Sequence, residues 1–239
     1  MPPIFKIVLR RNLGSKPDSR ILYYLTDGTL TEVRFFDELF NSTNFVSNKD
    51  IRIVKCEKTG DDEGVSNGLG LIKLAKKYIE SNPSFRKGYD KVLVVFDLDV
   101  YKNNLNDIIN AIHNEKDILF GYTNPSFELV LLLCLDKNFI SNLSEAKRKN
   151  IIENEFIGND RYIYHLIKKE YHFDSKNRSS NFLLVANCVS NSIAQSINIY
   201  IDNASDSLTC NIPYLLSKIN NNEIDDIVYF APLPENNVS

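Results

Sequence analysis

The segment KVLVVFDLD, at residues 91–99, constrains the fold of this chain more than any other part of its sequence. Five consecutive apolar residues are followed by two aspartates, Asp97 and Asp99, on either side of Leu98. A strand with one solvated face alternates apolar and polar residues, whereas a strand of a parallel sheet is buried on both faces and is apolar throughout. The segment therefore predicts a strand inside a parallel sheet that is covered by helices on both sides.

Strand-like and helix-like segments alternate around this run, from about residue 20 to about residue 135. Short runs rich in β-branched and aromatic residues predict strands at 21–26, 51–56, 90–99 and 117–122. Apolar residues at helical spacing predict helices at 30–40, 69–80, 103–114 and 126–135. Such alternation is typical of an α/β fold with a mostly parallel sheet flanked by helices.

From Ser144 onward the pattern changes to helices only, predicted at 144–156, 160–171, 181–201 and 212–221. We expect the third of these to be the main helix that covers the sheet, because Phe182, Val185 and Val189 recur at helical spacing. The prediction is one domain over residues 1–239, with an α/β core at about 20–135 and a helical C-terminal part at about 140–225.

Composition places the chain among globular proteins that bury a large core, since 43% of its residues are hydrophobic and 25% are charged. The N-terminus lacks the pattern of a secretory signal, and no apolar run reaches the roughly 18 residues of a membrane-spanning helix. The four cysteines are far apart and form no CxxC pair, so we expect reduced core thiols in a cytoplasmic protein.

A net charge of −3 gives no general case for nucleic-acid binding. The first twenty residues are nevertheless locally basic and leave a local patch open, through Lys6, Arg10, Arg11, Lys16 and Arg20.

Acidic residues follow the ends of three predicted strands. Asp27 follows the strand at 21–26, and Glu32 lies in the first turn of the helix after it. Asp97 and Asp99 end the strand at 90–99, and Glu128 follows the strand at 117–122 through an Asn-Pro turn. Functional groups of open α/β sheets gather beyond the carboxyl ends of the strands, so we expect these five carboxylates to share one cleft.

Crowded carboxylates repel one another and lose hydration, and a bound cation removes both costs. Oxygen ligands without histidine or thiolate favour Mg²⁺ or Mn²⁺ over zinc. These are the metals that phosphodiester-cleaving enzymes use. The sequence therefore predicts a divalent-metal site at this edge of the sheet.

Each acid also has a structural interpretation when it is taken alone. The Asp-x-Asp pair is compatible with a turn, Glu32 with a favourable helix dipole, and Glu128 with a buried salt bridge. Phosphate also requires cations, for which the sequence offers Arg34, Lys176 and Arg178, although a solvated loop position is the better interpretation of each one taken singly.

The segments TDGTLTEVRFFDELF, KVLVVFDLDV and GYTNPSFELVLLL together resemble the RloB-like family, proteins linked to restriction and abortive-infection loci. The resemblance covers about residues 20–135, with a weaker similarity at 211–219, and it implies a TOPRIM-like nuclease fold. It implies that Asp27 stands at the position of the TOPRIM glutamate. It further implies Asp97 and Asp99 as metal ligands, Glu32 and Glu128 as the additional acids of a two-metal site, and Lys176 as the family's lysine.

Two departures from the family pattern are visible. Asp27 stands where the family usually has glutamate, which shortens the side chain by one methylene, and no tryptophan follows Glu128. The first departure leaves two functions open: a Mg²⁺-dependent TOPRIM-type nuclease that cuts RNA or DNA in phage defence, or a non-catalytic regulatory or adaptor subunit of a defence complex. An ABC-type ATPase partner would be a separate protein, because the chain lacks a GxxxxGK[ST] motif. A homodimer also remains open.

Overall fold

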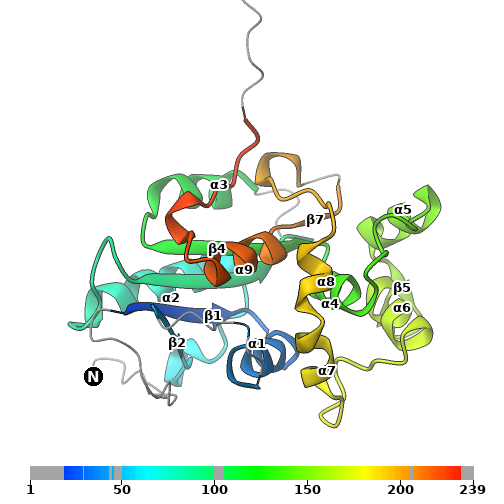
Figure 1. Ribbon diagram of the computed structural model, residues 1–239, viewed down its shortest axis with the longest axis horizontal. Coiled ribbons are helices and arrows are strands. Elements are labelled where there is room, and N and C mark those ends of the chain that lie inside the picture. Colours follow the sequence, from blue (N-terminus) through cyan, green and yellow to red (C-terminus); the bar gives the residue numbers. More distant parts are fainter. Residues whose placement is uncertain are drawn as a thin grey trace, which may run out of the picture.

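A five-stranded sheet with the order β2-β1-β3-β4-β7 forms the centre of the molecule (Figure 1). The first four strands are parallel to one another, and β7 pairs with β4 in the antiparallel direction. The strands are β1 Arg20–Thr26, β2 Ile51–Lys55, β3 Lys91–Asp97, β4 Ile118–Asn124 and β7 Thr209–Cys210. The prediction of an α/β fold with a mostly parallel sheet is confirmed, whereas β7 was not predicted.

The structure is a computed structural model, and it describes residues 19–28, 30–42, 45, 50–99, 105–204 and 207–232. Most of the predicted basic N-terminal patch, from Lys6 to Lys16, lies outside these residues. Arg20 is described, and it forms an ion pair with Asp225 at 2.7 Å.

Strand β3 lies inside the sheet, as its apolar run predicts. It pairs with β1 on one side and with β4 on the other, and all of its residues except Asp97 are buried. Leu93 and Val95 face one hydrophobic core, while Val92 and Val94 face a second core on the opposite side of the sheet. A strand between two cores needs apolar residues at every position, which explains the absence of alternation.

Helices cover both faces of the sheet. The first core is formed with α1 Thr31–Ser42, α4 Glu128–Leu135 and α9 Ile212–Asn220. The second core is formed with α2 Gly68–Ser81 and α3 Leu105–Asn114. In the view of Figure 1, α1 and α9 lie in front of the sheet and α2 lies behind it.

The second half of the chain adds a helical part beside the carboxyl ends of the strands. Its elements are α5 Glu145–Glu153, α6 Tyr162–Glu170, α7 Phe182–Asn187 and α8 Val189–Ile193, with a hairpin of β5 Phe156–Ile157 and β6 Asp160–Arg161 between α5 and α6. Short 3-10 turns occur at Gly60–Asp62, Ile201–Asn203 and Ile224–Asp226. Figure 1 shows α5, α6 and β5 projecting at the right-hand side.

The predicted single helix at 181–201 is wrong. The chain forms α7 and α8 there and leaves the helical conformation after Ile193, and Asn198 then bridges to Thr209 at the sheet edge. The side chain of Asn198 bonds both the N–H and the carbonyl of Tyr200, and such local bonds compete with helix formation. Among the described elements, the two helices pack chiefly against α1, α4 and α9, so they mainly cover other helices and are not the main cover of the sheet.

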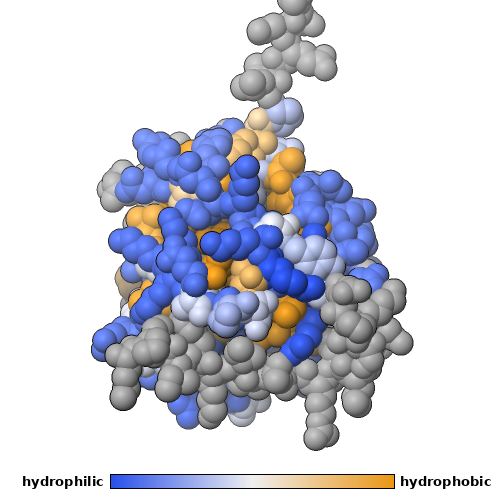
Figure 2. Space-filling view, turned by 90° about the vertical axis from the view of Figure 1, so that its left-hand side faces the viewer, coloured by the Kyte–Doolittle hydropathy of each residue, from blue (hydrophilic) through white to orange (hydrophobic). Residues whose placement is uncertain are grey.

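The four cysteines are free thiols, and three of them, Cys56, Cys134 and Cys210, are buried. No helix in the described part of the chain is long and apolar enough to cross a membrane. Figure 2 faces the left-hand side of Figure 1, where the strands begin, and shows a mainly hydrophilic surface with separate small hydrophobic patches.

Candidate active site

The predicted acids gather where the strand order of the sheet reverses. From β1 the chain continues through α1 to β2 on one side, and it then returns through α2 to β3 on the other side of β1. The connections therefore diverge between the carboxyl ends of β1 and β3. Ligands of open α/β sheets bind at this switch point, and Asp27 and Asp97 both lie there.

Asp27 joins these two strand ends. Its Oδ2 accepts a hydrogen bond from the N–H of Asp97 at 3.2 Å, and its Oδ1 accepts one from the N–H of Gly28 at 2.8 Å. The N–H of Asp27 also donates to the carbonyl of Val95 at 3.0 Å. The Asp27 carboxylate is therefore held across the β1–β3 boundary by backbone contacts.

Glu32 lies in the first turn of α1, and its carboxylate folds over Gly28. A Cβ atom added to Gly28 would lie 1.5 Å from Oε2 of Glu32. The space that the Glu32 carboxylate occupies therefore exists because residue 28 has no side chain. This close approach explains why a glycine follows Asp27.

Asp97 and Glu128 are each held by hydroxyl groups. Thr123 of β4 donates its Oγ1–H to Oδ1 of Asp97 at 2.7 Å. Ser126 donates to Oε2 of Glu128 at 2.8 Å, and the hydroxyl of the fully buried Ser175 lies 3.5 Å from Oε1 of Glu128. Glu128 is the first residue of α4, so a carboxylate there also faces the positive end of the helix dipole.

Four carboxylates share one electrostatic environment. Burial raises the pKa of Asp27 to about 6, although the N–H groups of Asp97 and Gly28 oppose the shift. Burial, followed by the charge of Asp27, raises the pKa of Glu32 to about 8. Burial and the charges of Asp27 and Glu32 raise the pKa of Asp97 well above its ordinary value, with a smaller effect from Glu128. A group of acids that resists ionisation is typical of a site built for a cation or a proton.

The carboxylates are close without yet forming a complete metal-ligand set. Within the described residues, no three side chains of Asp, Glu, His or Cys are arranged to hold a metal ion. Asp99, the fifth predicted acid, is half-buried two residues beyond the end of β3, at the last described position of that segment.

Lys176 stands at the rim of this cluster. Its ammonium lies over the ring of Tyr164 at 4.1 Å, and its side chain is exposed. The preceding residue, Ser175, accepts a hydrogen bond from Thr31 Oγ1 through its carbonyl and approaches Glu128 through its hydroxyl. Among the described residues, Lys176 forms no ion pair with a predicted acid, so its predicted part in the site depends on its position alone.

Arg34 holds the loop that carries Lys176. It donates to the carbonyls of Asn177 at 2.7 Å and Ser180 at 2.5 Å, and its guanidinium lies over the ring of Phe182 at 4.4 Å. These contacts favour a structural role over the predicted phosphate contact. Arg178 is exposed on the same loop.

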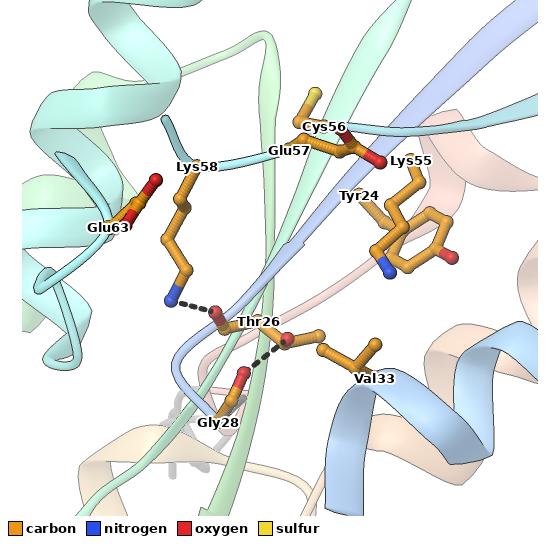
Figure 3. Close-up of a pocket in the computed structure, with 9 residues that line it drawn as sticks. All are labelled: Tyr24, Thr26, Gly28, Val33, Lys55, Cys56, Glu57, Lys58 and Glu63. Carbon is orange, nitrogen blue, oxygen red and sulfur yellow. Dashed lines mark hydrogen bonds between the residues drawn. The ribbon is translucent and has the colours of Figure 1, made fainter. Parts of the chain in front are cut away.

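Sequence reasoning missed Lys58, which reaches the cluster from the segment after β2. Its ammonium donates to the carbonyls of Val65 at 2.8 Å, Thr26 at 3.1 Å and Asp27 at 3.3 Å. Figure 3 shows the bond to Thr26. Burial lowers the pKa of Lys58, and the charges of Asp27 and Glu32 oppose that shift. A lysine just after a strand is usually solvated, so the residue type gave no reason to place Lys58 in the site. The one signal in the sequence was its position beyond the carboxyl end of a strand.

The fold and the site define an α/β protein with clustered carboxylates at the switch point of its parallel sheet. A family model described as RloB-like protein matches residues 23–219, so the chain belongs to the RloB-like family. The match also covers the helical part between residue 135 and the weaker similarity at 211–219. Comparisons with curated proteins and with solved structures gave no match.

Proposed function

We propose that this protein is a nuclease of the TOPRIM type that requires Mg²⁺ or Mn²⁺ and hydrolyses phosphodiester bonds of RNA or DNA. The observation that carries the proposal is the convergence of Asp27, Glu32, Asp97 and Glu128 from four different elements at the switch point of the sheet. Their oxygen-only chemistry and their raised pKa values, which three of the four display, fit a divalent cation.

In this proposal the acids that would hold the metal are the five predicted ones, including Asp99. A divalent ion at such a site neutralises phosphate charge and makes a hydroxide nucleophile accessible at neutral pH. The chain's own contribution is to fix the carboxylates: Asp97 through Thr123, and Glu128 through Ser126. Lys176 at the rim would contact the phosphate of the substrate.

The proposed biological role is that of an effector in phage defence. It is supported by membership of the RloB-like family, together with the link to restriction and abortive-infection loci that the resemblance in the sequence implies. The same reasoning supports a separate ABC-type ATPase as a partner, and cytoplasmic nucleic acid as the substrate.

A second function, a non-catalytic regulatory or adaptor subunit, is favoured by a different observation. Both oxygens of Asp27 accept backbone hydrogen bonds, and no complete ligand set is formed among the described residues. In that case the acidic cluster would stabilise the junction of β1 and β3, and a partner would supply any chemistry.

Digestion of nucleic acids by the purified chain separates the two functions. Plasmid DNA, single-stranded DNA and total RNA are incubated with the protein in Mg²⁺, in Mn²⁺ and in chelator. We expect metal-dependent cleavage that Asp97→Asn and Asp99→Asn abolish. Asp97→Asn is expected to keep or raise the melting temperature, because it removes one of several repelling charges.

Asp61→Asn is the matched control, since Asp61 is exposed in the turn after β2 and should leave cleavage unchanged. Equal cleavage by the parent and by both cluster variants would exclude the proposed mechanism. A folded parent that cleaves none of the three substrates would favour the adaptor.

A further inference from the structure

A pocket of about 420 Å³ borders the turn that carries Asp27 (Figure 3). The carboxyl ends of β1 and β2 form two of its walls, Val33 of α1 forms a third, and Glu63 closes it from the side of α2. This volume lies in the range of roughly 300–1,000 Å³ that is usual for small-molecule sites.

The pocket and the acidic cluster share one wall. Thr26 and Gly28 line the pocket, whereas Asp27, between them, belongs to the cluster. Thr26 Oγ1 donates to the carbonyl of Gly28 at 3.1 Å, and Lys58 binds the carbonyls of Thr26 and Asp27. A ligand in the pocket therefore lies next to whatever the carboxylates bind, separated from it by a single turn held by three hydrogen bonds.

The lining of the pocket favours a neutral group over an anion. Its two lysines, Lys55 and Lys58, are formally balanced by its two glutamates, Glu57 and Glu63. The ammonium of Lys58 is already bound by three carbonyls, and Lys55 is paired with Asp37 at 3.3 Å. A phosphate would therefore find no uncommitted cation among the lining side chains.

The remaining lining combines apolar walls with polar edges. The half-buried Val33 offers apolar surface, and Glu57 and Glu63 offer hydrogen-bond acceptors, while Tyr24 and Cys56 also line the pocket but are only 1% and 7% exposed. A nucleobase has apolar faces and a polar edge with amino groups that donate to such acceptors, so its chemistry matches this lining.

We infer that the pocket binds the base of one unpaired nucleotide of the substrate, adjacent to the phosphate at the acidic cluster. The inference rests on the proposed nuclease function for the identity of that phosphate. A base that is stacked and paired in a duplex cannot enter a pocket without leaving the stack. The substrate class is therefore single-stranded nucleic acid, or an unpaired position within a longer one.

Filling the pocket tests this inference. Val33→Trp places a large side chain in it, and Val228→Trp makes the same change at a residue that is 49% exposed elsewhere. Binding of a fluorescein-labelled single-stranded oligonucleotide is measured by anisotropy in Ca²⁺, which accepts oxygen ligands but does not impose the octahedral geometry of Mg²⁺. We expect Val33→Trp to weaken binding by about tenfold or more, the value of losing one well-held base.

Val228→Trp should bind like the parent, and the parent should bind the same sequence as a duplex at least about tenfold more weakly. Glu57→Ala provides a second test of the pocket if Val33→Trp does not fold. It should also weaken binding, because it removes one hydrogen-bond acceptor from the lining. Equal affinity of the parent and both pocket variants would overturn the inference, and so would equal affinity for single strand and duplex.

A free nucleoside that raises the melting temperature as much as the oligonucleotide would assign the pocket to a small molecule and also overturn the inference. Failure of the proposed function gives a different result. The parent would then show no cleavage in Mg²⁺ or Mn²⁺, while the effect of Val33→Trp on binding would still report on the pocket.

Discussion

Gly28 determines where the Glu32 carboxylate can lie. The Cβ of an alanine at residue 28 would lie 1.5 Å from Oε2 of Glu32, and the atom displaced would be the end of a flexible side chain. The backbone of Gly28 does not have the positive φ that makes substitution costly at Gly60 or Gly88. The glycine is therefore required by the carboxylate and not by the turn.

This geometry predicts that Gly28→Ala separates function from folding. The Glu32 carboxylate must move away, so metal affinity and cleavage should fall by about tenfold or more, since sites of this kind tolerate little displacement. The melting temperature in chelator should change little. Gly64→Ala is the matched control, because a Cβ there meets no atom within 4 Å. Unchanged metal affinity in Gly28→Ala would remove Glu32 from the site.

Asp27 raises a related question, since it stands where the family resemblance implies glutamate. Its carboxylate bonds the N–H groups of Gly28 and Asp97, and within the described residues neither bond caps α1. If Asp27 has a purely structural role, that role is therefore to link β1 to β3 by hydrogen bonds and not to cap a helix.

We predict that Asp27→Glu preserves or raises metal affinity and cleavage, because the longer side chain restores the reach of the usual acid. Asp27→Ala should abolish cleavage and cost about 1–3 kcal/mol of stability, because the N–H of Asp97 loses its partner. Asp61→Glu and Asp61→Ala provide the same changes on an exposed loop. If both Asp27 variants lose stability while turnover per folded molecule stays constant, the role of Asp27 is only to link β1 to β3.

At the scale of the elements, most of the first half of the fold follows from the sequence. Apolar runs and helical spacing are local, so they predicted β1 to β4 and α1 to α4 within a few residues. The meeting of Asp27 with Asp97 was predictable too, because the carboxyl ends of parallel strands share one edge of the sheet. Lys58 was not, since a lysine bound by three carbonyls of the main chain leaves no pattern in the sequence.

The far edge of the sheet was missed for a similar reason. Strand β7 is only two residues long, and the buried side chain of Asn211 continues its pairing with β4. Asn211 Oδ1 accepts from the N–H of Tyr122, and its Nδ2 donates to the carbonyl of Phe120, both at 2.7 Å. One side chain thus takes the place of a strand residue, and no periodicity signals such an arrangement.

This arrangement predicts that Asn211→Ala destabilises the protein by about 2–5 kcal/mol, because two buried backbone groups of β4 lose their partners. Denaturant unfolding measures the change, with the slope expected to stay constant. Asn221→Ala, at the exposed end of α9, should stay within about 0.5 kcal/mol of the parent. Equal midpoints for the two variants would contradict this account of the sheet edge.

At the scale of the whole molecule, the topology concentrates negative charge at one end of the sheet. The ends of β1 and β3 and the starts of α1 and α4 bring their acids to the switch point. Burial raises the pKa of Asp27 there, and burial together with the charges of neighbouring carboxylates raises the pKa values of Glu32 and Asp97. Folding without a cation therefore carries a cost that depends on pH. The same cost makes metal binding and folding stability thermodynamically linked.

The sign of this dependence follows from the direction of the shifts. In the folded state the pKa of Asp27 rises from 3.8 to about 6 and the pKa of Glu32 from 4.5 to about 8. Between these values the folded state therefore holds protons more tightly than the unfolded state. The contribution of these groups to stability is fully present below the unfolded values of about 4, and it is lost as the pH rises through about 6 to 8. In chelator, the melting temperature should therefore fall between about pH 5 and about pH 8.

Mg²⁺ should remove most of this fall, because a bound cation compensates the charges that appear as the acids ionise. The metal-dependent rise in melting temperature is thus expected to be several degrees at about pH 8 and much smaller at about pH 5. Glu32→Gln is the decisive variant, because the pKa of Glu32 is raised further than that of Asp27, and removing this carboxyl should flatten the pH dependence in chelator. Asp61→Asn should leave the profile unchanged. A parent protein whose melting temperature is the same with and without Mg²⁺ at both pH values would show that the acidic cluster holds no metal, and the adaptor function would then be the better account.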